Sequence, residues 1–321
     1  MLTSMQPPYV PKTAGVGGRP TIGTDIPVLA ILLFLYIVGA AAHMTVYQLN
    51  RQKDHKFLMS WAMFGFCMAR IATCVLRIVW ANRPTNSHVA IAAQILLNAG
   101  VLVAYIVVLI LSQRVLRATQ PRLGWNKLLA KMLTVLYILL FCAFVLVISF
   151  TVLSFYTLNL HLRSIALWIQ RVSILYILVF NIISLVMQLL SLLLPPSPER
   201  ENFGTGSMKL KQIILGAALF FCLFIAGFRA GTAWAALRPA SDPAWYDSKA
   251  AFYVIDFSFE IVIIYLLLIT RFDRMFWVPN SSRQPGDYSQ VNDFNDNSGD
   301  EPKLSAEAKL KTGSFKRNEL S

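Results

Sequence analysis

The chain has 321 residues, of which 56% are hydrophobic and only 14% are charged, and its formal net charge is +13. Soluble domains carry roughly 25% charged residues, so this composition argues against a soluble enzyme with a large core. The apolar residues come in blocks of about 20, the length at which a helix crosses the bilayer core. We therefore expect an all-α fold, a polytopic membrane bundle of transmembrane helices.

Seven blocks are long and apolar enough to span the membrane. In chain order, the predicted spans cover residues 26–48, 57–81, 89–111, 132–155, 165–194, 213–237 and 250–271. The transmembrane domain then comprises residues 26–274. The polar segments 1–25 and 275–321 hold too few apolar residues to fold alone, so we expect disordered tails at both ends.

Lysine and arginine are unequally divided between the two sides of this bundle. The loops after spans one, three and five hold eleven: Arg51, Lys53, Lys56, Arg114, Arg117, Arg122, Lys127, Lys131, Arg200, Lys209 and Lys211. The opposite loops hold four: Arg83, Arg163, Arg238 and Lys249. Since basic loops stay in the cytoplasm, we expect the N-terminus outside and the C-terminal tail in the cytoplasm.

This distribution also explains the net charge of +13. The basic residues flank the spans and serve membrane topology, so no nucleic-acid partner is expected. The expected partners are membrane lipids, a small-molecule or lipid ligand and an unidentified cytoplasmic protein. The expected location is the plasma membrane or another endomembrane.

Cysteines and histidines give no sign of metal or redox chemistry. Cys67, Cys74, Cys142 and Cys222 all fall within predicted spans, where cysteine acts as a small apolar residue. The four histidines lack HxxxH or HExxH spacing, and we expect His43 to bond a neighbouring helix. No nucleophile and base can be paired, so neither a cofactor nor an enzymatic activity is predicted.

Charged residues inside the spans are the most informative feature of the chain. Asp256 and Glu260 lie four residues apart in span seven, on one helix face. Arg70 and Arg77 lie in span two, and Arg229 lies in span six. A charge at membrane depth costs about 2.5–3.5 kcal/mol on insertion scales. We therefore expect these side chains to face one another inside the bundle.

Their depths agree when each residue advances the helix by about 1.5 Å. Gln94 and Asn98 share a face of span three at a similar depth, so polar groups from several spans meet in the outer half of the bundle. The predicted polar core, a ligand-binding or ion-pair site, consists of Arg70, Arg77, Gln94, Asn98, Arg229, Asp256 and Glu260.

Depth alone pairs Arg229 with Asp256 and Arg70 with Glu260. One interpretation is that these pairs only clamp the helices, since buried pairs can fix the register of a bundle. The other is that they line an outward-opening ligand or transport cavity. The sequence leaves both open.

Arg77 and Arg171 bear on the charge of such a cavity. If both joined the core, four arginines would face two acids and leave an excess of +2. That excess would suit an anionic group such as a phosphate or carboxylate. Both arginines could instead extend to the membrane interface.

Span six also contains a GxxxG pattern at Gly227 and Gly231. Such a pattern is a common seam between membrane helices, because glycine lets two backbones approach closely. We expect another helix to pack closely on these glycines.

Several segments carry a resemblance to known families. They are residues 70–77 (RIATCVLR), 228–231 (FRAG), 244–256 (AWYDSKAAFYVID), 271–279 (RFDRMFWVP) and 285–289 (PGDYS), together with Glu260. They resemble an uncharacterised family of fungal seven-span integral membrane proteins. More distantly, the arginine late in span six and the aromatic, acid-containing span seven resemble the fungal lipid-translocating exporter and toxin-resistance family. Where that family has a Glu-x-x-Gly-Tyr-like element in span two, this chain has Arg70 and Arg77.

The function expected from the sequence is to bind or move an amphipathic, anionic small molecule or lipid through the polar core. One alternative is a receptor-like membrane sensor that signals through its cytoplasmic side. Seven spans alone resemble G-protein-coupled receptors, but the Asp/Glu-Arg-Tyr and Asn-Pro-x-x-Tyr motifs are missing. A structural membrane protein without a ligand is the third hypothesis.

Overall fold

The computed structural model describes residues 7–9, 14–53, 55, 57–236, 238–239, 241–279 and 282–288. These residues form helices and connecting loops, and seven of the helical segments are long and apolar enough to cross a membrane. The six uninterrupted ones are α1 (Ile22–Gln52), α2 (Leu58–Asn82), α3 (Ser87–Thr119), α5 (Lys127–Tyr156), α6 (Leu160–Leu193) and α7 (Met208–Trp234). The seventh covers Lys249–Ile269. The prediction of an all-α, seven-span bundle is confirmed.

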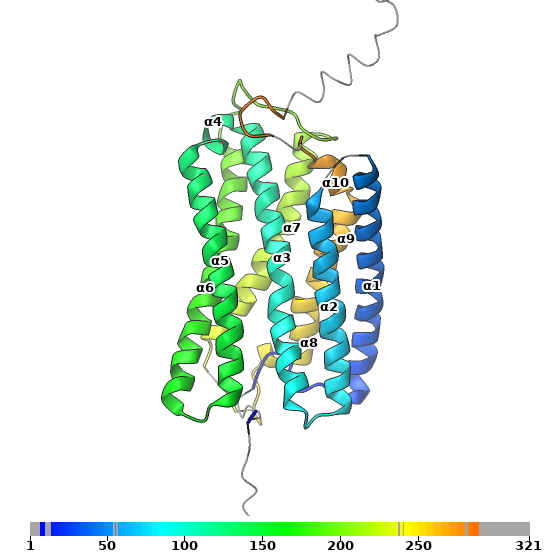
Figure 1. Ribbon diagram of the computed structural model, residues 1–321, viewed down its shortest axis with the longest axis vertical. Coiled ribbons are helices and arrows are strands. Elements are labelled where there is room, and N and C mark those ends of the chain that lie inside the picture. The colour runs from blue at the N-terminus through cyan, green and yellow to red at the C-terminus, as the bar shows by residue number, and fades with distance from the viewer. Residues whose placement is uncertain are drawn as a thin grey trace, which may run out of the picture.

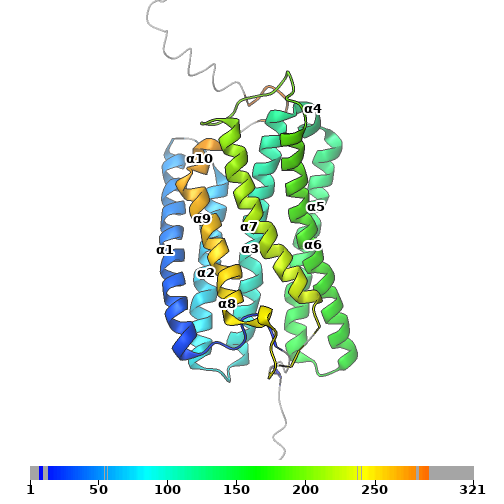
Figure 2. The ribbon, with the colours of Figure 1, turned by 180° about the vertical axis from the view of Figure 1, so that it is seen from behind.

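The long helices run side by side along one axis of the molecule (Figures 1 and 2). We call one end the amino-terminal face; it carries residues 14–21 and the loops α2–α3, α5–α6 and α7–η1. The other end, the carboxy-terminal face, carries the short helices α4 (Pro121–Gly124) and α10 (Phe272–Met275) and residues 282–288. Both views place α3 in the middle of the bundle, and α3 is also the most buried span.

The seventh span is irregular, unlike the single regular helix that its sequence predicts. It starts with a 3-10 turn, η1 (Trp245–Asp247), and a short α8 (Lys249–Ala251), which lead into the π-helix η2 (Phe252–Ser258) and then α9 (Phe259–Ile269). The Phe259 N–H donates to the Val254 carbonyl five residues back, the pairing that defines a π-turn. The Ser258 hydroxyl donates to the Tyr253 carbonyl at 3.0 Å.

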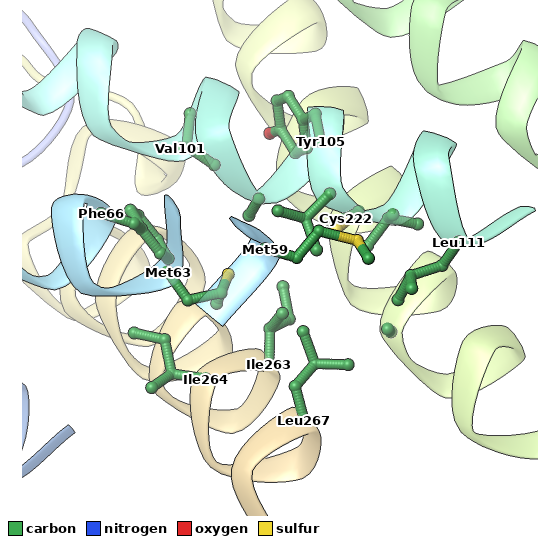
Figure 3. Packing of buried hydrophobic residues seen from close by; sticks show 14 of the residues in the cluster. Met59, Met63, Phe66, Val101, Tyr105, Leu111, Cys222, Ile263, Ile264 and Leu267 are labelled. Carbon is green, nitrogen blue, oxygen red and sulfur yellow. The ribbon is translucent and has the colours of Figure 1, made fainter. Parts of the chain in front are cut away.

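The apolar core lies between α3 and its neighbours. Figure 3 shows side chains of α3 meeting side chains of α2, α7 and α9. The labelled members are Met59, Met63, Phe66, Val101, Tyr105, Leu111, Cys222, Ile263, Ile264 and Leu267, and all are buried. Because α3 contacts helices on several sides, its position helps to set the positions of the polar residues on those helices.

The amino-terminal segment packs on the bundle before the predicted boundary at residue 25, and the Tyr9 N–H already donates to the Phe155 carbonyl at 2.7 Å. The Ala14 N–H donates to the Arg238 carbonyl at 2.9 Å, and the Gly17 N–H donates to the Asp247 carbonyl at 3.1 Å. Gly17 has a φ of +75°, and a Cβ atom there would lie 2.4 Å from the Phe252 ring. Only glycine therefore fits this contact without a shift.

The carboxy-terminal segment also packs beyond its predicted boundary at residue 275. The Glu201 carboxylate accepts hydrogen bonds from the backbone N–H groups of Gly286 at 2.8 Å and Tyr288 at 2.9 Å. The Tyr288 ring lies edge-on to Trp125, with 5.5 Å between the ring centroids. The predicted disorder of residues 289–321 falls outside the described residues.

The glycines that make close contacts differ from those expected. A Cβ atom at Gly227 or Gly231 would meet no atom within 4 Å, so the predicted close packing at this GxxxG pattern is wrong. Close approach occurs instead at Gly39, where a Cβ would lie 3.2 Å from Ile264, and at Gly100, where it would lie 3.4 Å from the Arg70 guanidinium carbon. The spacing of glycines indicates where two helices could pack closely. The arrangement of the neighbouring helices decides where they do.

Substitution of these glycines tests the packing of the amino-terminal segment. Gly17→Ala introduces both the Phe252 clash and an unfavourable φ, so we expect a loss of at least about 1 kcal/mol of stability. Gly227→Ala has open space and a helical backbone, so the thermal unfolding midpoint of the purified protein should stay unchanged or rise slightly. Equal midpoints for the two variants would contradict the packing at Gly17.

Candidate functional site

Arg70 of α2 and Glu260 of α9 form an ion pair in the middle of the bundle. The Arg70 Nε and Nη2 groups donate to the two oxygens of the Glu260 carboxylate, and both side chains are fully buried. A third donor, Nη1, bonds the Leu97 carbonyl of α3 at 2.9 Å. The Tyr36 hydroxyl of α1 lies 3.5 Å from Glu260 and donates to the Phe257 carbonyl at 3.1 Å. Four spans thus meet at this pair.

A second pair, Arg229 of α7 with Asp256 of the π-helix, adjoins the first. The Arg229 Nε donates to Asp256 Oδ1 at 2.7 Å, and Nη2 lies 3.4 Å from the Leu97 carbonyl and 3.9 Å from Glu260. Because both arginines reach the same carbonyl, the four charged residues form one network. We call Arg70, Arg229, Asp256 and Glu260 the charge network. The two pairings expected from depth are the ones that form.

The other two arginines lie outside the charge network. The Arg77 Nη2 donates to the Gly17 carbonyl at 3.4 Å, and its guanidinium lies 4.3 Å from the centroid of the Phe252 ring. The Arg171 Nε donates to the Ala233 carbonyl at 2.8 Å, near the end of α7. The condition for an excess of +2 charges in the core is therefore not met, because the network contains two arginines and two acids.

A further buried carboxylate, which the sequence analysis missed, lies near the amino-terminal face. Asp25 of α1 pairs with Lys249 of α8 and accepts hydrogen bonds from the Tyr253 hydroxyl at 2.5 Å and the Thr21 N–H at 2.7 Å. These bonds tie the first span to the irregular start of the seventh. The sequence signal that could have identified Asp25 was its position next to the start of the first predicted span.

A cavity of about 1310 Å³ lies between α3, α5, α6, α7 and the π-helix, and extends to the loops of the amino-terminal face. In Figure 2, α7 crosses the bundle obliquely and lies beside α6 at this end, away from the seventh span. Arg229 and Asp256 line the cavity together with Gln94 and Asn98. We call these four residues and Tyr105 the cavity floor. The apolar walls include Val101, Leu102, Phe144, Val147, Leu167, Ile174 and Ile177.

The exposure of the two pairs to this cavity differs. Arg229 retains 17% of its side-chain exposure and Asp256 retains 4%, whereas Arg70 and Glu260 retain none. Arg229 and Asp256 therefore face the cavity, and the other pair supports them from behind. Of the seven residues predicted for the site, only Arg77 lies apart from this arrangement.

Tyr105 is the second feature that the sequence analysis missed. This α3 residue is fully buried and lines the cavity, and its hydroxyl has no hydrogen-bond partner among the described residues. A buried hydroxyl without a partner costs free energy, and a tyrosine within an apolar span gives no sequence signal of that state.

The site suits binding through hydrogen bonds and apolar contacts. The His43 ring contacts the Ile264 carbonyl through Nε2 at 3.3 Å, so this residue joins two helices as expected. Among residues that the structure describes, no three His, Cys, Asp or Glu side chains gather as a metal site. The cavity thus combines the polar groups of the floor with long apolar walls.

No protein-family model, curated protein or solved structure matches this chain. Its resemblance to fungal seven-span proteins stays a prediction. The cavity and its floor are therefore the features that indicate a function.

The first test concerns the buried pair. Glu260→Gln keeps the shape of the side chain but leaves Arg70 buried without a counterion, which should cost about 3–5 kcal/mol. We expect a lower folded yield and a lower thermal unfolding midpoint. Replacing both residues by methionine removes the two charges together and should restore part of that loss.

The exposed pair between Arg122 and Glu199 supplies a matched control, because both side chains are more than half exposed, at 83% and 52%. Surface pairs contribute little, so Glu199→Gln should leave the midpoint unchanged. If Glu260→Gln unfolds at the same temperature as the parent protein, the buried pair does not hold the bundle together.

Proposed function

We propose that this integral membrane protein binds an amphipathic small molecule or lipid in its interhelical cavity. The observation that carries the proposal is the division of the cavity into a polar floor and apolar walls. A ligand of mixed polarity could satisfy the hydrogen-bonding groups of the floor and cover the walls at the same time. The proposed role is binding or movement of this ligand, without catalysis.

The size of the cavity supports a ligand with a long apolar part. Its volume of about 1310 Å³ exceeds the roughly 300–1,000 Å³ of ordinary small-molecule pockets. The apolar wall residues extend along three helices, so an extended chain could contact α3, α5 and α6 together. Lipids and lipid-like compounds have this shape.

The side of the membrane follows from the basic loops. The loops of the amino-terminal face carry few lysines and arginines, and those of the carboxy-terminal face carry many. This distribution supports a cavity that opens on the outer side of the membrane. Since the described lining reaches the loops of the amino-terminal face, we propose ligand entry from that side of the plasma membrane or of an endomembrane.

The irregular seventh span favours ligand movement over static binding. π-turns occur frequently at functional sites, and transporters commonly bind ligands beside interrupted helices. Here the π-helix Phe252–Ser258 carries Asp256, which lines the cavity floor. A change in the conformation of the π-helix would move Asp256 relative to Arg229. Such a change would link ligand binding to the conformation of the seventh span.

A pair of valines on α5 tests the cavity as the binding site. Val147 lines the cavity and is 6% exposed, whereas Val145 on the same helix is 44% exposed and faces outward. Val147→Trp should fill the cavity and reduce ligand affinity at least about tenfold, and Val145→Trp should leave it unchanged.

The measurement is saturable photolabelling of the full chain in phosphatidylcholine nanodiscs. Three probes share one hexadecyl chain with a diazirine and an alkyne, and they end in an alcohol, a sulfonate or a trimethylammonium group. We expect at least one probe to label α3 or α5 peptides saturably and to lose labelling with Val147→Trp. If none of the three labels saturably, or if both tryptophan variants label like the parent, the proposed function is wrong.

A further inference from the structure

We infer that the polar end of the ligand is an uncharged, hydroxyl-like group that binds at the cavity floor beside Arg229 and Asp256. This inference rests on the proposed function and specifies the chemical class of the ligand. It replaces the anionic ligand expected from the sequence.

Charge balance is the first argument. The charge network contains two arginines and two carboxylates, and all four side chains are buried or nearly so. Arg77 and Arg171 bond backbone carbonyls elsewhere and add no charge to the floor. A bound ion of either sign would add a charge that this balanced network does not neutralise, which is unfavourable beside buried groups. A neutral polar group avoids this cost.

Hydrogen-bonding capacity is the second argument. Arg229 and Asp256 bond each other through Nε and Oδ1, so Arg229 keeps further N–H donors and Asp256 keeps the Oδ2 acceptor at the cavity surface. The floor therefore offers donors and an acceptor. A hydroxyl group can accept one hydrogen bond and donate another, so it satisfies both kinds of atom.

The walls fix the orientation of the ligand. An alkyl chain placed against the floor would exclude water from the remaining hydrogen-bonding atoms of Arg229 and Asp256, which is unfavourable. The same chain placed along Phe144, Val147 and Ile174 would contact apolar groups. The polar end therefore lies at the floor, and the chain lies along these walls.

Charged residues at the mouth of the cavity do not alter this assignment. Lys249 lines the mouth but pairs with Asp25. Arg19 is exposed and Arg163 is half-buried, so both remain accessible to water at this end. A charged headgroup at the mouth would require the apolar end to lie on the polar floor.

The three hexadecyl probes test the charge of the ligand directly. In neutral phosphatidylcholine nanodiscs, the alcohol should bind at least about tenfold more tightly, per mole fraction of lipid, than the sulfonate or the trimethylammonium probe. If a charged probe binds as tightly as the alcohol or more tightly, the inference is wrong but the proposed function stands. If no probe binds saturably, both are wrong.

A change in the charge of the cavity floor should change which of the three probes binds most tightly. Asp256→Asn keeps the shape of the side chain and leaves two arginines facing one carboxylate, so the sulfonate should then bind more tightly than the alcohol. Folding of this variant is checked by its thermal unfolding midpoint and by labelling with the alcohol probe. A folded Asp256→Asn protein that still prefers the alcohol would contradict the charge-balance argument.

Discussion

The buried pair between Arg70 and Glu260 is the constraint on which the rest of the structure depends. Both side chains are fully buried, and either charge alone would be costly at membrane depth. The second and seventh spans must therefore lie side by side at one register. The Leu97 carbonyl accepts a further hydrogen bond from the guanidinium, and Gly100 of α3 allows the close approach. Three spans are thus positioned by one interaction.

The cavity floor follows from the same arrangement. Once Glu260 is fixed, the π-helix before it places Asp256 opposite Arg229, whose guanidinium reaches back to the Leu97 carbonyl. The two pairs cancel each other's charge, so the floor is polar but neutral. Tyr105 adds an unpartnered hydroxyl beside it, among the residues that the structure describes. Residues that must neutralise one another's charge inside a membrane can therefore also form a site that selects a neutral hydroxyl group.

The sequence predicts the spans because bilayer thickness sets helix length, and it predicts both ion pairs because depth follows from helix rise. It does not predict the position of Arg77, because the Gly17 carbonyl and the Phe252 ring that hold it come from distant segments. The π-helix has no local sequence signal, and Tyr105 looks like any apolar-span tyrosine. Tertiary packing also decides that the glycine pattern at Gly227 meets no helix.

A double-mutant cycle on Asp256→Asn and Glu260→Gln tests most directly whether the four charges form one network. In the Asp256→Asn variant, Arg229 still has Glu260 at 3.9 Å. In the Glu260→Gln variant, Arg229 keeps Asp256, but the double variant leaves both arginines without an acid. We therefore expect the double variant to lose at least about 1 kcal/mol more unfolding free energy than the sum of the single losses. Losses that add to within about 0.5 kcal/mol would show two independent pairs and contradict a shared network.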